Sequence, residues 1–242
     1  MTLSMLQFAP DLSRLTRWAE ARRLMQGGSQ DDLGYALHAV LRAAFDALAP
    51  APFALLREKA TPARLLAYTA HAPGALRDHA ASFAEPDALA AVGFSGMADK
   101  VMPERFPPGC RLGFTLRARP TVRTDRDGAR GRTRERDAFL AAIDGTAPGT
   151  GPERAAVYQA WLTRHLSAGG ASAEHLLLDG FRRSRATRRD AARQLGKVEY
   201  PEAQFSGVLR VDDPARFGAL LARGVGRHRA FGFGMLLLRP AY

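Results

Sequence analysis

Three polar side chains early in the chain are spaced so that one bound molecule could contact all of them. On a helix that begins near Asp31, Tyr35 and His38 are three positions apart and His38 and Arg42 are four apart, so the three share one flank. A histidine exchanges protons readily near neutral pH. A nearby tyrosine can orient the base, and an arginine can stabilise charge on a phosphorane-like transition state. The spacing therefore indicates acid–base chemistry at a phosphate group.

The same spacing is also typical of an ordinary half-buried helix. Beside the polar flank runs a broad apolar stripe, which consists of Leu33, Ala36, Leu37, Val40, Leu41, Ala44, Phe45 and Leu48. A surface histidine on such a helix needs no function, so the spacing alone leaves this structural interpretation open. The six histidines of the chain show no HExxH or comparable ligand spacing, and we predict no metal site and no cofactor.

Glycines and basic-type residues alternate near the end of the chain, from Gly224 to Gly234 (GVGRHRAFGFG), directly before an apolar strand. Glycine allows positive φ and a close approach of the backbone to a ligand, and successive amides can form an anion-binding concavity. A nucleotide-binding P-loop fits poorly, because the GxxxxGK[ST] order is missing and a strand follows instead of a helix. A flexible β-turn on a basic surface is the alternative interpretation. The residues expected to contact phosphate here are Gly224, Gly226, Arg227, His228 and Arg229.

The composition points to an acidic partner. The 242 residues carry a net charge of +11, and only three of the 35 basic residues, at positions 59, 100 and 197, are lysines. Arginine binds phosphate through two donors and stacks on bases, so its dominance suits RNA, although codon usage in a GC-rich genome would also enrich it. One cysteine, Cys110, excludes an intramolecular disulfide and a multi-cysteine zinc site. No signal peptide and no run of about 18 apolar residues is visible, so we expect a soluble, cytoplasmic protein without a membrane partner.

Arginines gather in two runs that cannot bury a core. Eight arginines fall between Arg117 and Arg136, together with two glycines, and this segment is expected to be an exposed loop or hairpin. The second run extends from Arg182 to Arg189 and follows the start of a strand at Leu176. Both runs are candidates for holding a nucleic-acid backbone.

The order of the remaining elements favours two small α+β units. Strands are expected at 2–8, 53–58, 64–70, 112–120, 205–211 and 235–239, and helices at 11–25, 31–48, 152–168 and 212–223. Pro103, Pro107, Pro108 and Gly109 form a stiff break between domains at 1–102 and 110–242. Short alternating elements predict two tandem ferredoxin-like domains of the α+β class, with a single irregular α+β domain as the alternative.

Four segments of the chain resemble the CasE family, the CRISPR repeat-RNA endonucleases of type I-E systems. They are Tyr35-Ala-Leu-His38, the strand 112–120 with its basic tract, the strand Phe205-Ser-Gly-Val-Leu-Arg-Val211, and the segment 224–234 with the terminal strand. The segments span both halves of the chain and keep the order of the family. The glycine-rich segment together with the Phe-x-Gly-x-Leu strand carries most of the likeness, since Tyr-x-x-His is a short motif.

The resemblance implies tandem ferredoxin-like (RNA-recognition-motif-like) domains and metal-independent cleavage of a repeat hairpin by attack of a 2′-hydroxyl on the adjacent phosphate. By this likeness His38 is the general base or acid and Tyr35 assists it, whereas the role of Arg42 comes from helix geometry alone. The implied partners are the CRISPR repeat RNA hairpin and the other subunits of Cascade, the antiviral surveillance complex. The arginines expected to hold the stem backbone are Arg117, Arg119, Arg123, Arg182, Arg183, Arg185, Arg188 and Arg189.

One departure from the family concerns the position of His38. Thirty positions separate Phe8, at the end of the first strand, from His38, which is more than the family usually needs, and the excess includes the helix at 11–25. Either an insertion decorates the first domain or the catalytic histidine is placed wrongly. A repeat-processing enzyme of another CRISPR subtype, a non-catalytic RNA-binding subunit and a structural RNA binder are the alternative interpretations.

Overall fold

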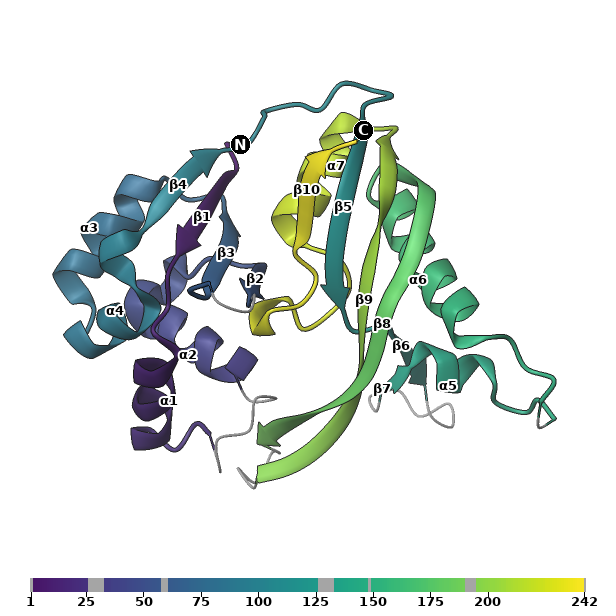
Figure 1. Ribbon diagram of the computed structural model, residues 1–242, viewed down its shortest axis with the longest axis horizontal. Coiled ribbons are helices and arrows are strands. Elements are labelled where there is room, and N and C mark those ends of the chain that lie inside the picture. Colours follow the sequence, from purple (N-terminus) through teal and green to yellow (C-terminus); the bar gives the residue numbers. More distant parts are fainter. Residues whose placement is uncertain are drawn as a thin grey trace.

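Two four-stranded antiparallel sheets form the body of the protein (Figure 1). The computed structural model describes residues 2–25, 33–57, 61–125, 133–147, 149–189 and 195–241. Helices α3, α4 and α6 lie on the outer sides of the two sheets, away from the middle of the molecule. Within the described ranges, no helix is both long and apolar enough to cross a membrane.

The first sheet has the strand order β2-β3-β1-β4. Its strands are β1 (Ser4–Phe8), β2 (Phe53–Leu56), β3 (Arg64–Thr69) and β4 (Ala98–Val101). Its helices are α1 (Leu12–Ala21), α2 (Leu33–Phe45), α3 (Pro73–Phe83) and α4 (Pro86–Val92), with 3-10 turns η2 (Asp46–Leu48) and η3 (Phe94–Gly96). The Asp11 carboxylate accepts a hydrogen bond from the Arg14 amide, which caps α1.

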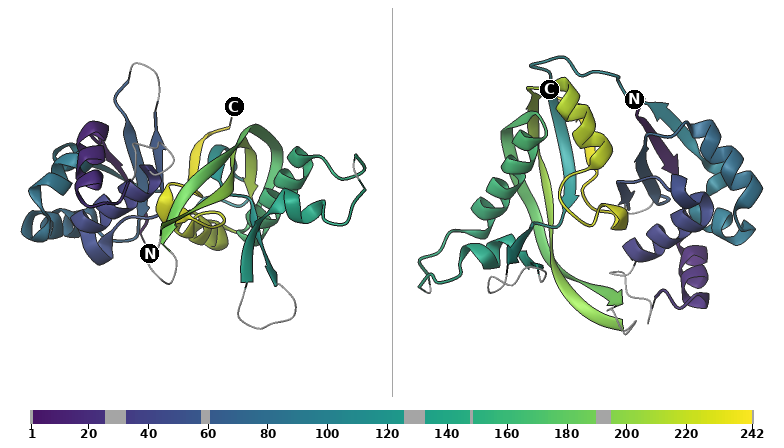
Figure 2. Two further views of the ribbon diagram at one scale, coloured as in Figure 1. Left: turned by 90° about the horizontal axis from the view of Figure 1, so that it is seen from below. Right: turned by 180° about the vertical axis from the view of Figure 1, so that it is seen from behind.

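The second sheet has the strand order β10-β5-β9-β8. Its strands are β5 (Arg111–Ala118), β8 (Ala171–Arg189), β9 (Leu195–Val211) and β10 (Leu236–Pro240). Its helices are α5 (Ala138–Ala142), α6 (Arg154–Ala168) and α7 (Pro214–Arg223), followed by the 3-10 turn η4 (Arg229–Phe231). The first basic run contains a hairpin of β6 (Thr121–Asp125) and β7 (Thr133–Asp137), which projects from the body (Figure 2).

The two sheets share one arrangement when their strands are numbered within each half. In both, the order along the sheet is second, third, first and fourth strand, with all neighbours antiparallel. This is the strand order of a ferredoxin-like domain. The fold class predicted from the sequence, two tandem ferredoxin-like domains, is therefore confirmed.

Two features of the sheets differ from the prediction. The strand β4 was not among the expected strands, and all four of its residues are exposed. An edge strand that pairs with β1 alone needs no alternating apolar pattern, so the sequence carries no sign of it. Strands β8 and β9 are also longer than expected and continue past the sheet as a curved two-stranded ribbon (Figure 1).

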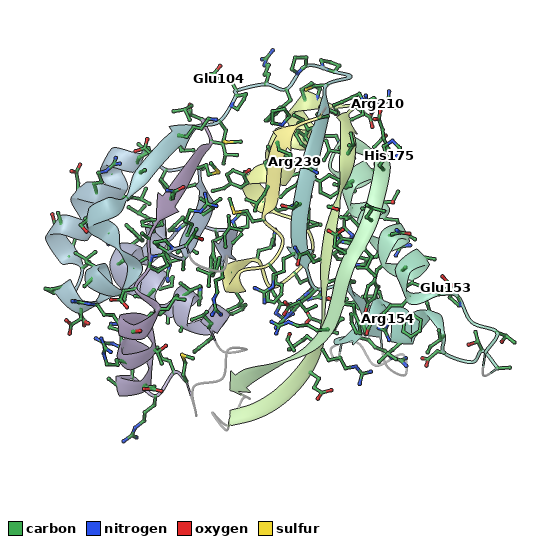
Figure 3. All side chains as sticks on the ribbon, in the orientation of Figure 1. Glu104, Glu153, Arg154, His175, Arg210 and Arg239 are labelled. Atoms are coloured by element: carbon green, nitrogen blue, oxygen red, sulfur yellow. The ribbon has the colours of Figure 1, made fainter. Side chains whose placement is uncertain are left out.

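The two halves are packed against each other. Leu66 and Tyr68 of β3 form an apolar cluster with Met235, and the Tyr68 hydroxyl donates to the Leu236 carbonyl oxygen at 3.0 Å. The segment from 102 to 110, which includes Glu104, connects β4 to β5 along one edge of the molecule (Figure 3). The domain limits 1–102 and 110–242 agree with this connection and stay a prediction.

Candidate catalytic and RNA-contacting site

Helix α2 presents Tyr35 and His38 to an aromatic ring from the other half of the chain. The Tyr35 ring lies stacked on Phe231, with ring centroids 6.1 Å apart and an interplanar angle of 20°. The His38 ring meets the same phenylalanine edge-on, with centroids 5.1 Å apart. The opposite side of the helix is buried in the first core, as its apolar stripe predicts. The predicted pair of residues therefore converges on a third ring that the sequence analysis did not single out.

Gly34 brings the backbones of the two halves into contact at this point. A Cβ atom placed on Gly34 would lie only 2.4 Å from the Phe231 carbonyl oxygen. This separation is much shorter than a van der Waals contact. The clashing atom belongs to the backbone, which cannot change rotamer as a side chain can. A glycine at this position of α2 is thus required by the close approach of η4.

Arg42 is directed toward the end of its own helix. Its guanidinium pairs with the Asp46 carboxylate at 3.1 Å and also donates to the Asp46 carbonyl oxygen. The Arg42 guanidinium is thus bound to Asp46 in this structure. That Arg42 contacts the same molecule as His38 stays a prediction.

Burial lowers the pKa of His38 below the ordinary value of a histidine, and the positive charge of Arg42 lowers it further. Both effects favour the neutral imidazole at neutral pH. A neutral imidazole that is still partly accessible can accept a proton, which is the requirement for a general base.

The residues Gly224–Gly234, which we call the glycine-rich loop, fold into a closed structure. The Val225 amide donates to the Gly234 carbonyl oxygen at 2.8 Å, and the Gly234 amide donates to the Arg117 carbonyl oxygen at 2.7 Å. A Cβ atom on Gly224 would lie 3.0 Å from Pro52, and one on Gly226 would lie 2.8 Å from Trp161. The predicted close approach of these two glycines is therefore an approach to the protein itself, and the amides of Gly224, Val225 and Gly234 are used within the fold.

Arg119, expected on the RNA surface, lies inside the protein. Its side chain is 4 % exposed, and its guanidinium lies over the rings of Tyr200 at 4.4 Å and Phe233 at 4.2 Å. It also donates to the Ser184 hydroxyl at 3.2 Å. The expectation of an exposed segment is wrong at this position, because tertiary packing buries this member of the run. Contact of Arg119 with RNA stays a prediction.

His228 is likewise turned toward partners within the protein, and its contact with RNA stays a prediction. Its Nδ1 lies 3.4 Å from the Arg119 guanidinium, and its Nε2 lies 2.9 Å from the Glu135 carboxylate. Because an arginine can only donate, Nδ1 accepts and Nε2 carries the proton that is donated to Glu135. Burial is the largest cause that lowers the pKa of His228, which is consistent with a neutral ring. The neighbouring Arg227 pairs with Glu135 as well.

The remaining predicted arginines are divided between partly paired and open positions. Glu202 accepts from Arg117 at 2.7 Å and pairs with Arg182 at 2.9 Å; burial opposes its ionisation, yet these two arginines hold the pKa of Glu202 below its usual value. Arg123 is exposed on β6, and Arg183 on β8 is exposed with Glu199 at 3.8 Å. Arg229 donates to the Arg223 carbonyl oxygen at 2.7 Å. The side chains of Arg185, Arg188 and Arg189, which belong to β8, lie outside the described residues.

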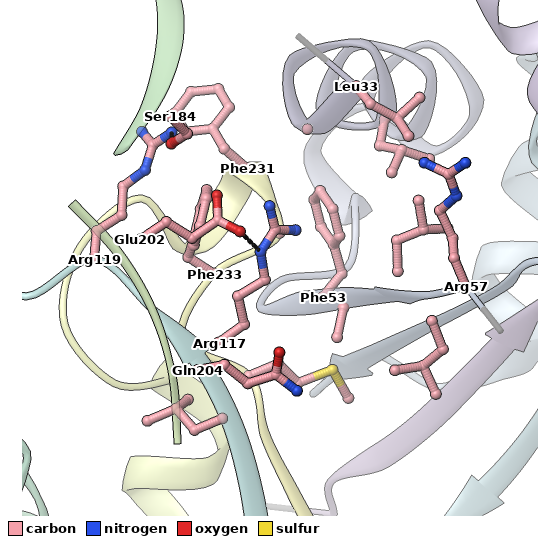
Figure 4. A pocket seen from close by; sticks show the side chains of 18 of the residues that line it. Leu33, Phe53, Arg57, Arg117, Arg119, Ser184, Glu202, Gln204, Phe231 and Phe233 are labelled. Atoms are coloured by element: carbon pink, nitrogen blue, oxygen red, sulfur yellow. Dashed lines mark hydrogen bonds and ion pairs between the residues drawn. The ribbon is translucent and has the colours of Figure 1, made fainter. Parts of the chain in front are cut away.

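A cavity of about 380 Å³ lies between the two sheets next to these groups (Figure 4). Three aromatic residues, Phe53, Phe231 and Phe233, line it together with Arg117 and Arg182. Its walls thus combine rings and cations from both halves. In the part of the chain that the structure describes, no group of three or more His, Cys, Asp or Glu side chains is arranged to hold a metal ion.

Several residues of the site escaped the sequence analysis. They are Gly34, Phe231 and the buried partners Glu135, Ser184 and Tyr200. Phe231 had a usable signal, since it is an apolar ring inside a segment of glycines and basic residues that offers no local core. The other four are identified only by contacts with residues that are distant in the sequence.

Comparisons with known proteins identify a family to which this chain is similar. The model of the family described as CRISPR associated protein matches residues 11–240. The CRISPR-associated endoribonuclease Cse3 of Thermus thermophilus is 34 % identical in an alignment of length 142, which covers 55 % of this chain and 57 % of that protein. The match therefore spans little more than half of that relative.

Solved structures resemble this chain over its whole length. A CRISPR endoribonuclease Cse3 bound to a 19-nucleotide RNA is 21 % identical, with a TM-score of 0.63 and coverage of 99 % of this chain and 100 % of the other. A chain of a CRISPR RNA-guided surveillance complex in a pre-nicking state is 17 % identical, with a TM-score of 0.57 and coverage of 100 % of both chains. At these identities the likeness establishes the fold alone.

Proposed function

Because the chain belongs to the family of CRISPR associated proteins, whose model matches residues 11–240, we propose that it is an endoribonuclease that cleaves CRISPR precursor RNA within the repeat hairpin without a metal ion. The observation that carries this proposal is the convergence of Tyr35 and His38 on Phe231 at the junction of two ferredoxin-like domains. The curated relative is named an endoribonuclease, and the resemblance of four sequence segments to CasE supports the same activity.

The proposed reaction needs two proton transfers and no external reactant. The 2′-hydroxyl of one nucleotide loses its proton and attacks the adjacent phosphorus, so a 2′-oxygen–phosphorus bond forms while the bond to the 5′-oxygen breaks. A proton is delivered to the leaving 5′-oxygen, which leaves a 2′,3′-cyclic phosphate and a 5′-hydroxyl. The lowered pKa of His38 favours its action as the base in the first transfer. Tyr35 orients the imidazole or the phosphate from the same flank of α2.

The basic surface holds the RNA stem in this proposal. Exposed arginines lie on β6 and on the β8–β9 ribbon, at Arg123, Arg182 and Arg183. The A-form major groove admits side chains poorly, so contacts with the phosphate backbone dominate recognition of a stem. Retention of the cut RNA and membership of the cytoplasmic Cascade complex are part of the proposal, which the likeness to a chain of a surveillance complex supports.

Cleavage of the repeat hairpin from the same genome, measured in EDTA under single-turnover conditions, tests this function. Wild type should cut the hairpin, and His38→Ala should slow cleavage by about 100-fold or more, because general acid–base catalysis contributes on the order of 10²–10⁴ to a rate. His71→Ala is the matched control, since His71 is exposed and lies far from the glycine-rich loop in the sequence. The His71→Ala variant should cut at the wild-type rate.

Other outcomes of the same experiment identify the alternatives. Tight binding of the hairpin without cleavage by wild type would make the protein a non-catalytic RNA-binding subunit. Equal cleavage by wild type and His38→Ala would keep the enzyme but remove His38 from its mechanism.

A further inference from the structure

We propose that Phe231 is a positioning residue that holds the rings of Tyr35 and His38 in their reactive arrangement, and that the glycine-rich loop serves the reaction by carrying this ring to helix α2. The inference rests on the proposed function and adds a residue from the C-terminal half to a site that the sequence placed in the N-terminal half. It also gives the loop a role other than direct contact with RNA.

The first support is the contact itself. One phenylalanine ring meets Tyr35 face to face and His38 edge to face, with centroid separations of 6.1 and 5.1 Å. Aromatic rings at such separations prefer defined mutual orientations, which limits the rotation of both partners. Tyr35 and His38 have no other ring contact among the described residues, so Phe231 is their shared aromatic support.

The second support is that the position of Phe231 is fixed from three sides. Its carbonyl oxygen lies against Gly34 of α2. The next residue, Gly232, has a φ of 85°, and a Cβ atom there would lie 3.2 Å from the Phe53 ring. The Phe231 amide donates to the His228 carbonyl oxygen at 2.9 Å. A ring attached to so constrained a backbone can act as a rigid support.

The third support is the buried network behind the loop. His228 is held through both ring nitrogens, by Arg119 of the segment after β5 and by Glu135 of β7. Arg119 is held in turn by Ser184 of β8. A buried polar network that holds both ring nitrogens of His228 favours one arrangement of the loop. The loop is therefore attached to three elements of the C-terminal half before it reaches α2.

The surroundings of His38 give the inference a readout in the pH profile. The charged residue on α2, the helix of His38, is Arg42. The titratable and charged groups on the glycine-rich loop have partners of their own: His228 is bound to Glu135, and Arg229 donates to the Arg223 carbonyl oxygen. The contacts of α2 with the first core are apolar. Burial is the largest cause of the lowered pKa of His38, and the Phe231 ring covers part of that imidazole. Removal of the ring admits water and should raise the pKa of His38 toward its ordinary value.

The test compares wild type with Phe231→Ala, Phe231→Tyr and Phe83→Ala in single-turnover cleavage of the repeat hairpin in EDTA, across the neutral pH range. Phe231→Ala should slow cleavage on the order of 10–100-fold at neutral pH, the loss expected when catalytic groups lose their alignment. Phe231→Tyr keeps the ring and should stay close to wild type. Phe83 is 78 % exposed on α3, so Phe83→Ala controls for the loss of a phenylalanine and should change nothing.

Two further readouts separate positioning from a loss of folded protein. The affinity for a hairpin with 2′-deoxy nucleotides, which cannot be cut, should be the same for wild type and Phe231→Ala. The midpoint of the pH limb that reports His38 should move upward in Phe231→Ala, whether His38 acts as base or as acid. A smaller folded fraction would scale all rates without moving that midpoint.

A wild-type rate and an unmoved midpoint in Phe231→Ala would overturn the inference. Should Phe231→Ala not fold, the pKa of His38 is measured by NMR in Phe231→Leu without RNA, where a rise supports the contact and an unchanged value refutes it. Failure of wild type to cut the hairpin would reject the proposed function instead, and the NMR comparison would still decide whether Phe231 governs His38.

Discussion

Arginine side chains of the same basic run have different roles in this protein, and burial separates them. Arg119 is 4 % exposed and lies between two aromatic rings, whereas Arg123, four positions later, is exposed on the β6–β7 hairpin. A buried guanidinium needs hydrogen-bond and ring partners to offset its lost hydration, and Arg119 has both. An exposed guanidinium remains available for phosphate. The sequence run alone assigns both to RNA.

Substitution should distinguish the two roles. Arg119→Ala should lower the free energy of unfolding by about 2–4 kcal/mol, because it opens a cavity between Tyr200 and Phe233 and leaves the Ser184 hydroxyl and the His228 ring short of a partner. Arg123→Ala should change stability by less than about 0.5 kcal/mol and should weaken binding of the repeat hairpin. Urea unfolding and a hairpin-binding assay measure the two effects. Equal stability of both variants would contradict the buried role of Arg119.

Local periodicity made part of the site predictable from the sequence, whereas the residues brought there by long-range packing could not be predicted. Tyr35 and His38 share a flank because helix geometry fixes the angle between positions three apart, so their pairing could be predicted before the fold was known. Phe231 reaches them only because the chain returns to α2 after the second sheet is complete. No pattern within the loop reports that contact.

Helix α2 and the glycine-rich loop depend on each other at the scale of elements. The helix buries one side in the first core and presents the other to the 3-10 turn η4 at a distance that only glycine permits. The loop, in turn, is closed by its own hydrogen bonds and by the network around His228. The proposed catalytic flank is thus defined by the docking of two elements and not by the helix alone.

Two glycine-to-alanine substitutions in helices should have opposite effects. Gly218 of α7 has no atom within 4 Å of an added Cβ, so Gly218→Ala should stabilise the protein by up to about 1 kcal/mol through its helix propensity. Gly34→Ala should instead destabilise it by about 1–3 kcal/mol, the usual cost of an overpacked contact, and should slow cleavage. Urea unfolding and the cleavage rate of the two variants check this. An equal gain in stability from both would show that η4 does not rest on α2.

Some strands could be predicted from sequence patterns and others could not. The central strands β1, β3 and β5 were predicted because they alternate or carry continuous apolar residues that meet the cores. The ribbon formed by the distal parts of β8 and β9 was not, since the sequence of β8 there is a run of arginines, 182–189, without an alternating apolar pattern. A charge run therefore gives no indication that the backbone beneath it is a strand.

At the scale of the whole molecule, the site exists only where the two ferredoxin-like halves meet. Helix α2 and Arg57 belong to the first half, while Phe231 and the other arginines around the cavity, Arg117, Arg119 and Arg182, belong to the second. The Tyr68 hydroxyl and the cluster with Met235 join the sheets next to this place. The tandem order of the domains was predictable from alternating elements, but their mutual packing, which builds the site, was not.

The central claim is that a 2′-hydroxyl of the RNA is the nucleophile at this junction, and one substitution in the substrate tests it without altering the protein. The cut site is mapped with the unmodified repeat hairpin, and the single-turnover rate in EDTA is then measured on a hairpin with one 2′-deoxy nucleotide on the 5′ side of that site. We predict that the deoxy hairpin binds as tightly as the unmodified one but is not cut, while the unmodified hairpin yields a 2′,3′-cyclic phosphate. Cleavage of the deoxy hairpin at the rate of the unmodified one would contradict the account.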